Sequence, residues 1–168
     1  ANIGGLNEAR DISATDSCTF AQGKVIEDAT NSRNISYNIS DSAANIAAGI
    51  GSDAAVITAA TTAAANTYAT VTELEVIGAD TNAIVFSTKD TAANLAGATA
   101  ARILKAVNTI ATTSANVTQA TSIDTNTSAG AGGYNTFNIV DTDANVAGAG
   151  NTLLAKAGTV ITTGTANV

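Results

Sequence analysis

Three short segments of the chain begin with an aromatic residue and continue with alternating polar and inward-facing positions. They are Tyr37-x-Ile39, Phe86-x-Thr88 and Phe137-x-Ile139. Alternation with a period of two is typical of a β-strand that has one buried face. We therefore predict a strand at each of these positions and expect Tyr37, Phe86 and Phe137 to face the core.

An Ala-rich stretch follows each strand and has the composition of a helix. It opens with an Asp and reaches an Asn four residues later, in the runs Asp41–Asn45, Asp90–Asn94 and Asp141–Asn145. Ala and Leu have high helix propensity. A carboxylate at a helix start accepts hydrogen bonds from free N–H groups and complements the positive end of the helix dipole. We therefore predict that Asp41, Asp90 and Asp141 are the N-caps of these helices.

The strand and helix pattern returns at intervals of about 50 residues, which indicates an array of repeats. A second strand is expected in each unit, at residues 12–15, 57–60, 110–113 and 161–164. Residues 63–70 then read as an insertion in one copy. We predict one repeat domain, 1–168, with units 1–33 (partial), 34–81, 82–134 and 135–168 (partial). A chain that opens and closes inside repeats is expected to be a processed piece or a segment of a longer protein.

The repeating order of strand, crossover and strand, with about 25 residues for each turn of the solenoid, predicts parallel strands joined by right-handed connections. The predicted fold is an α/β solenoid, with one parallel sheet on one side and short Ala-rich helices on the other. Neighbouring strands lie about 4.8 Å apart, whereas packed helices need roughly 8–10 Å. Small side chains relieve that mismatch, which explains the abundance of Ala. The alternative fold is an all-β parallel solenoid in which the Ala stretches are extended.

The charge of the chain argues against two classes of partner. Seven Lys and Arg stand against 14 Asp and Glu, for a formal net charge of −7. Such a chain has no basic stripe to neutralise phosphates, so we predict no nucleic-acid partner. An anionic membrane surface would repel it, and no run of 18 apolar residues predicts membrane insertion.

The residue types needed for most catalytic sites are missing from the sequence. It has no His and a single Cys, Cys18, which excludes Ser-His and Cys-His catalysis and zinc sites of the usual ligand types. Cys18 is expected to be a small buried side chain, with a reactive thiol as the alternative. A catalytic carboxylate pair would have to come from acidic residues that read as surface charge: Asp11, Asp16, Glu27, Asp28, Glu73 and Glu75. We therefore predict no enzymatic activity and no cofactor.

Asp141, Asp143 and Asn145 resemble the opening of a calcium-binding loop. A complete EF-hand loop also needs Gly at its sixth position and a carboxylate at its twelfth. Val146 and Thr152 occupy those positions. These three residues are therefore a weak calcium candidate, and helix capping is the role expected for the motif.

Exposed Thr residues on the second strands suggest an ice-binding surface as one alternative function. With the Ile residues inward, the outward positions are Ser13, Thr58, Ala111, Thr162 and their neighbours two residues on. This array is irregular, so ice binding is the weakest of the alternatives considered.

The runs Ile39-Ser-Asp-Ser-Ala-Ala-Asn-Ile-Ala47 and Thr88-Lys-Asp-Thr-Ala-Ala-Asn-Leu-Ala96 resemble tandem repeats of very large secreted and cell-surface proteins of proteobacteria and cyanobacteria, described as adhesin-, hemagglutinin- or S-layer-like. The resemblance covers essentially the whole chain at the level of the repeat. It implies a passive spacer or surface scaffold, outside the cell, with no catalytic residues.

The expected function is a non-enzymatic structural protein that stacks end to end into a fibre or surface layer, with other copies or neighbouring repeats as its partners. The alternative from the binding class is an adhesin segment that recognises glycans or surfaces. Clustered exposed aromatic residues would favour that alternative.

Overall fold

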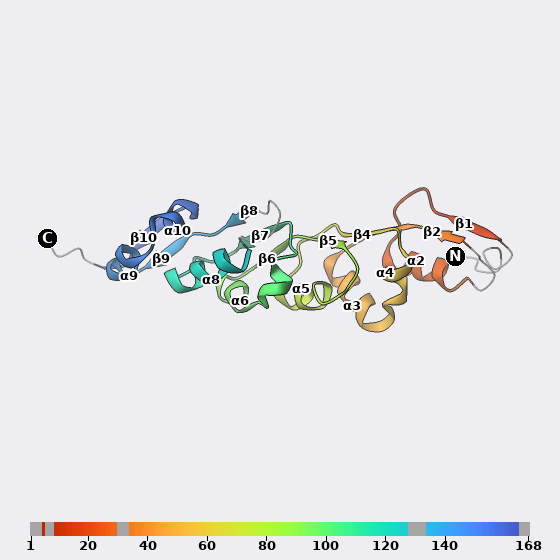
Figure 1. Ribbon diagram of the computed structural model, residues 1–168, viewed down its shortest axis with the longest axis horizontal. Helices are drawn as coiled ribbons and strands as arrows, with labels where there is room; N and C mark the ends of the chain where they lie inside the picture. Colours follow the sequence, from red (N-terminus) through yellow and green to blue (C-terminus); the bar gives the residue numbers. More distant parts are fainter. Residues whose placement is uncertain (1–4, 6–8, 30–33, 128–133, 165–168) are drawn as a thin grey trace.

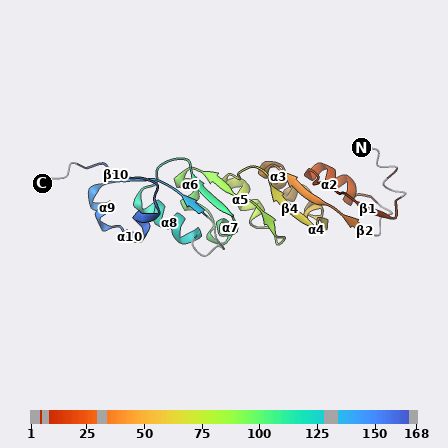
Figure 2. The ribbon, with the colours of Figure 1, turned by 90° about the horizontal axis from the view of Figure 1, so that it is seen from above.

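The computed structural model describes residues 5, 9–29, 34–127 and 134–164 of the chain. The repeat units follow one another along the long axis of an elongated molecule, from β1 at one end to α9, α10 and β10 at the other (Figure 1). Strands run along one side of this axis, and helices α3, α5, α6 and α8 run along the other. The view from above shows the same progression (Figure 2).

The described secondary structure alternates short strands and short helices. The strands are β1 (Asp11–Ser13), β2 (Asn34–Ser36), β3 (Asn38–Asp41), β4 (Thr62–Ala65), β5 (Ile84–Val85), β6 (Thr88–Asp90), β7 (Asn108–Ala111), β8 (Tyr134–Thr136), β9 (Ile139–Asp141) and β10 (Val160–Thr162). The helices are α2 (Phe20–Glu27), α3 (Ala43–Asp53), α4 (Ala55–Ala59), α5 (Val71–Ile77), α6 (Ala92–Gly97), α7 (Ala100–Ile103), α8 (Val117–Thr127), α9 (Asp143–Gly148) and α10 (Asn151–Lys156).

The predicted α/β solenoid with one continuous sheet is wrong. The described strands form four small separate sheets, with the orders β1-β2, β3-β4-β5, β6-β7-β8 and β9-β10. Every strand pair in them is parallel, as the crossover pattern indicated. The all-β alternative is wrong as well, because the Ala-rich stretches form helices α3, α6 and α9.

The aromatic residues mark the points where the ladder breaks. Tyr37 lies between β2, which pairs with the preceding β1, and β3, which pairs with the following β4. Phe86 separates β5 from β6, and Phe137 separates β8 from β9, with the same change of partner. All three aromatic side chains are buried, with at most 2% of their surface exposed. At each break the aromatic side chain lies in the core, and single bridges from Cys18, Ala69 and Ala115 reach β3, β6 and β9.

The second strand of each unit lies one or more residues away from its predicted position. Residues 57–60 fall in and just after helix α4, and the strand of that unit is β4. Its inward position is Ala63, which corresponds to Ile12 in β1 and Thr109 in β7; all three are buried. Residues 63–70 are therefore the regular second half of the unit and not an insertion. Ile161, predicted to point inward, is 54% exposed.

Small residues allow helices from the two halves of a unit, and from neighbouring units, to approach one another. Helix α3 packs against α5 and α6 packs against α8. In these contacts the fully buried residues of α3 and α6 include Ala43, Ile46, Ala92 and Leu95. Gly49 of α3 faces the ring of Phe20, and a Cβ atom at Gly49 would overlap that ring. Gly51 of the same helix has open space at the corresponding position.

Replacing these two glycines by alanine is expected to have opposite effects. Gly49→Ala adds a methyl group inside the Phe20 contact and should destabilise the protein by about 1–3 kcal/mol. Gly51→Ala removes backbone freedom from the unfolded chain without a clash and should stabilise it by about 0.5–1 kcal/mol. Urea unfolding followed by circular dichroism measures both. Equal effects of the two substitutions would show that the Phe20 contact does not set the helix spacing.

Candidate functional site

Asp41 lies where the end of one strand meets the beginnings of two helices. Its Oδ2 accepts a hydrogen bond of 2.9 Å from the backbone N–H of Phe20, the first residue of α2. Its Oδ1 accepts from the backbone N–H of Ser42 at 2.8 Å and from the Asn45 side-chain amide at 2.8 Å. We call this carboxylate with its three donors an Asp junction.

The same junction recurs in the next two units with the same atoms in the same roles. Asp90 accepts from the N–H of Val71 (2.9 Å), the N–H of Thr91 (2.7 Å) and the Asn94 side chain (2.9 Å). Asp141 accepts from the N–H of Val117 (2.9 Å), the N–H of Thr142 (2.8 Å) and the Asn145 side chain (2.7 Å). Val71 and Val117 are the first residues of α5 and α8.

The prediction that Asp41, Asp90 and Asp141 are the N-caps of the Ala-rich helices is wrong by one residue. The N-caps are Ser42, Thr91 and Thr142, whose hydroxyls accept from the backbone N–H three residues on. The Asp residues bind instead the first N–H of a helix that lies 19–24 positions earlier in the chain. Each carboxylate therefore joins two helices that a local cap would not connect.

Two further hydroxyls lie at the Asp41 and Asp90 junctions. Thr67 accepts a hydrogen bond of 3.0 Å from the N–H of Ala43, the first residue of α3. Thr113 does the same for Ala92, the first residue of α6, also at 3.0 Å. The first turns of both helices at each junction are thus supplied with acceptors, which free N–H groups at helix starts require.

The hydrogen bonds at each junction lower the pKa of its Asp. For Asp41 and Asp90, burial acts to raise the pKa, but bonds from the Asn side chain and from the two backbone N–H groups outweigh it. For Asp141 the pKa is lowered by the bond from Val117, followed by those from Asn145 and Thr142. The charged form is therefore the one that the folded chain stabilises.

Asp41→Asn is expected to destabilise the protein by about 1–3 kcal/mol. The substitution keeps the size of the side chain but removes the charge that faces two helix N-termini. In either orientation of the new amide, its N–H₂ group faces N–H donors, on the side of Phe20 or on the side of Ser42 and Asn45. Asp90→Asn should have an effect of the same order. Asp16→Asn, at an exposed carboxylate, is the control and should change stability by less than about 0.5 kcal/mol. Thermal unfolding of the variants tests this. A loss of stability in Asp41→Asn no larger than that of the control would contradict the structural role of the junction.

The stability of the protein should fall in acid because of these three carboxylates. Their pKa values are lower in the folded chain than in the unfolded chain, where they are about 4. Their contribution is therefore complete above about pH 4 and disappears as the pH falls through the lower folded values. Urea unfolding measured from pH 7 to pH 2 should show this loss. The loss should be smaller in an Asp41→Asn, Asp90→Asn double variant; an unchanged loss would mean that other groups cause it.

The weak calcium candidate does not have the geometry of a cation site. Both carboxylate oxygens of Asp141 already accept hydrogen bonds, and Asn145 directs its amide N–H₂ toward Asp141. Asp143 lies instead beside Gly164, where a Cβ atom would overlap its carboxylate. Asp143 and Gly164 take the places of Ala43 and Thr67 in the unit 34–81. The larger residue on one side of the contact is thus matched by the smaller one on the other.

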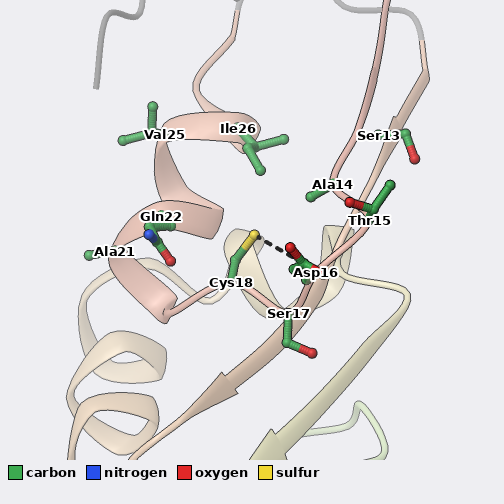
Figure 3. A pocket seen from close by; sticks show the side chains of 10 residues that line it. All are labelled: Ser13, Ala14, Thr15, Asp16, Ser17, Cys18, Ala21, Gln22, Val25 and Ile26. Atoms are coloured by element: carbon green, nitrogen blue, oxygen red, sulfur yellow. Dashed lines mark hydrogen bonds between the residues drawn. The ribbon is translucent and has the colours of Figure 1, made fainter.

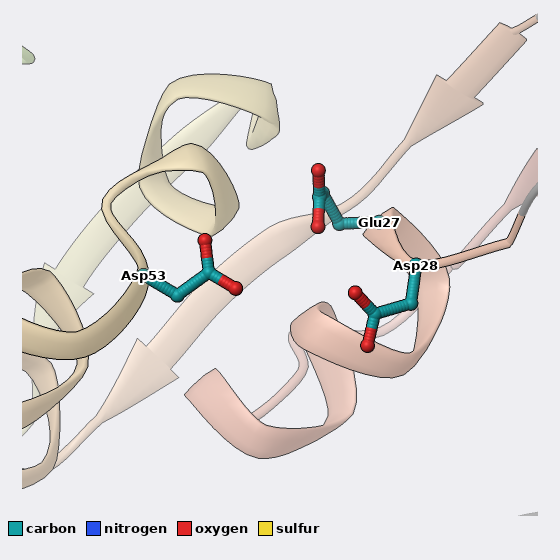
Figure 4. A group of neighbouring side chains, drawn as sticks. All are labelled: Glu27, Asp28 and Asp53. Atoms are coloured by element: carbon teal, nitrogen blue, oxygen red, sulfur yellow. The ribbon is translucent and has the colours of Figure 1, made fainter.

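A separate acidic group is formed by Glu27, Asp28 and Asp53, which offer carboxylate oxygens within 4.8 Å of one another (Figure 4). Glu27 and Asp28 lie at the end of α2, and Asp53 ends α3. Lys24 already supplies a cation there, since its Nζ lies 2.6 Å from Asp53 and 3.0 Å from Asp28. Hydrogen bonds to Asp53 and then Asp28 raise the pKa of Lys24. An ion pair accounts for this group without a metal.

Cys18 lies beside a hollow of about 600 Å³ between β1 and α2 (Figure 3). Its side chain is buried and its Sγ is 3.9 Å from the carbonyl oxygen of Asp16. Ala69 and Ala115 take its place in the other units and pair with β6 and β9 as Cys18 pairs with β3. These observations agree with the expected role of Cys18 as a small buried side chain.

Three of the remaining candidate carboxylates have structural partners, and the fourth is exposed. Glu73 completes a capping box with Thr70 at the start of α5. Glu75 binds Arg102 and the N–H of Thr99, and these bonds lower its pKa against the opposing effect of burial. Asp11 accepts from Asn34 at 2.7 Å. Asp16 is exposed.

Two surface residues, Tyr68 and Lys89, were not singled out by the sequence. Tyr68 replaces a serine, since Ser17 and Ser114 precede the residues equivalent to Ala69. The difference between Tyr68 and the serines of the other units is visible in the sequence. Because residues 63–70 were interpreted as an insertion, Tyr68 was not aligned with those serines.

Comparison with protein-family models, with curated protein sequences and with solved structures finds no match to this chain. The resemblance to adhesin-like and S-layer-like repeats therefore stays a prediction. In the described part of the chain, no helix has both the length and the apolar character needed to cross a membrane.

Proposed function

We propose that this chain is a non-enzymatic structural protein, an extracellular repeat scaffold that forms a fibre or surface layer by end-to-end association of copies. The observation that carries the proposal is the Asp junction, which repeats along one axis and connects each unit to the next. Its polar groups bind one another and leave no acid or base aimed at a substrate. Side chains bonded in this way hold neighbouring units in a fixed arrangement, as a scaffold requires.

The two end strands support association at the ends. β1 and β10 are the first and last strands of the described chain, and like the other strands at sheet edges each pairs with one strand. An unpaired parallel edge has free N–H and C=O groups that can pair with another chain. A second copy would supply such a partner.

The C-terminal layer exposes apolar groups that the inner layers bury. Ile46 and Leu95, in α3 and α6, are fully buried, whereas the equivalent Val146 of α9 is only half-buried. No residue of α9 or α10 is fully buried among those described. Val160 and Ile161 are 38% and 54% exposed on β10. Burial of these apolar groups against another copy of the chain would be favourable.

The ice-binding alternative finds less support in the structure than in the sequence. Thr58, one of its outward positions, lies in helix α4. The described strands are divided among four sheets, so they do not present one flat array of hydroxyls. We do not propose this function.

Placing a charge on the exposed end strand should weaken self-association. In Ile161→Lys, a buried contact between copies would require desolvation of an ammonium group, so the concentration needed for assembly should rise by about tenfold or more. Analytical ultracentrifugation across a range of concentrations, with electron microscopy of the same samples, measures this.

Val85→Lys is the matched control, because Val85 is 57% exposed on β5 in the middle of the chain. It should leave assembly unchanged. Wild-type protein that stays monomeric at every concentration and forms no fibres would contradict the proposal, and an equal effect of both substitutions would contradict the assignment to the end strand.

A further inference from the structure

Tyr68 is the one aromatic side chain on the surface among those that the structure describes. It is 50% exposed, whereas Phe20, Tyr37, Phe86 and Phe137 are buried. Ser17 and Ser114 occupy the equivalent positions of the neighbouring units, so the fold itself does not need an aromatic ring there. The ring therefore calls for an explanation beyond packing.

Lys89 is a second departure from the repeat and lies next to the first. Its Nζ lies 5.8 Å from the centre of the Tyr68 ring. Ser40 and Val140 take its place in β3 and β9, as the hydrogen bonds of these residues to Cys18, Ala69 and Ala115 show. Lys24, Arg102 and Lys156 form ion pairs. Lys89 makes none within the described residues.

A small hollow of about 230 Å³ lies beside the ring, lined by Ala65, Asn66, Thr67, Tyr68 and Ser87. The side chain of Asn66 makes no hydrogen bond to the described part of the chain. The Ser87 hydroxyl oxygen accepts from Asn108 at 3.3 Å, which leaves its proton free to be donated. An aromatic ring, an amide and a hydroxyl thus line one hollow, and the ammonium group of Lys89 lies over the same ring.

We propose that Tyr68 and Lys89 form a subsite for one uronic-acid residue of an acidic polysaccharide. The apolar C–H face of the sugar ring stacks on Tyr68, and its carboxylate binds the ammonium group of Lys89. Asn66 and Ser87 bind the ring hydroxyls. This function is independent of end-to-end association and would attach the scaffold to a glycan.

The size and polarity of the site favour a single sugar over a protein surface. Ligand pockets for drug-sized molecules are about 300–1,000 Å³, so this hollow fits one ring. A stable protein interface needs roughly 800 Å² on each partner, with an apolar centre, and polar groups surround Tyr68. The net charge of −7 opposes an anionic glycan, and salt of about 0.15 M screens the part of this repulsion that acts beyond roughly 8 Å.

The test uses methyl β-D-glucuronide as the probe and methyl β-D-glucoside as its neutral counterpart, titrated into ¹⁵N-labelled protein and followed by NMR. The glucuronide should cause saturable shifts at residues 65–68 and 87–89, with millimolar affinity. Tyr68→Ser and Lys89→Ser install the residues found in neighbouring units, so both variants should fold. Each should weaken glucuronide binding by about tenfold or more. Arg10→Ser removes an exposed cation elsewhere and should leave binding unchanged.

Three outcomes would overturn the proposal. Equal affinity for the glucoside would exclude the role of Lys89, and unchanged binding by a folded Tyr68→Ser variant would exclude the stacking platform. The absence of saturable shifts with either sugar would leave a protein contact centred on Tyr68 as the better explanation of its exposure. None of these outcomes bears on self-association, which is measured without sugar.

Discussion

The rest of the structure depends on one carboxylate per unit that binds two helix starts at once. Asp41, Asp90 and Asp141 each accept from the first N–H of a helix earlier in the chain and from the N–H of the residue that caps the next helix. A negative charge at the positive ends of two helix dipoles is favourable for both. Because the donors belong to different units, the contact fixes how the units are placed relative to one another as well as how each helix begins.

A difference in spacing explains the remainder of the architecture. Strands in a sheet are about 4.8 Å apart and packed helices roughly 8–10 Å, so the sheet side and the helix side of the chain favour different spacings. The chain changes strand partner at Tyr37, Phe86 and Phe137, and four short sheets result. Ala and Gly on the helices reduce the distance at which neighbouring helices can pack. The tightest such contact is that of Gly49 with the ring of Phe20.

Most of the candidate reactive groups have structural partners in the part of the chain that the structure describes. The described carboxylates mostly serve caps, junctions and ion pairs, and the thiol of Cys18 fills a place that alanine takes in the other units. The departures from the repeat are therefore the informative positions. Tyr68 and Lys89 place an aromatic ring and a cation on the surface of one unit. At the last junction, Asp143 and Gly164 put a larger residue on one side of the contact and a smaller one on the other.

The sequence by itself determined the repeat, the Ala-rich helices, the parallel direction of the strands and the inward position of the three aromatic residues. Each of these follows from local periodicity or composition. Only the tertiary structure decided where the ladder breaks, which residue caps each helix, and that the second strand of one unit begins at Thr62 and not near Ile57. The reason is physical: a period of two predicts a strand but not its partner, and an Asp beside a helix start is free to bind any N–H that packing brings near. Phe20 and Asp41 are 21 residues apart in sequence, and no local pattern marks them as partners.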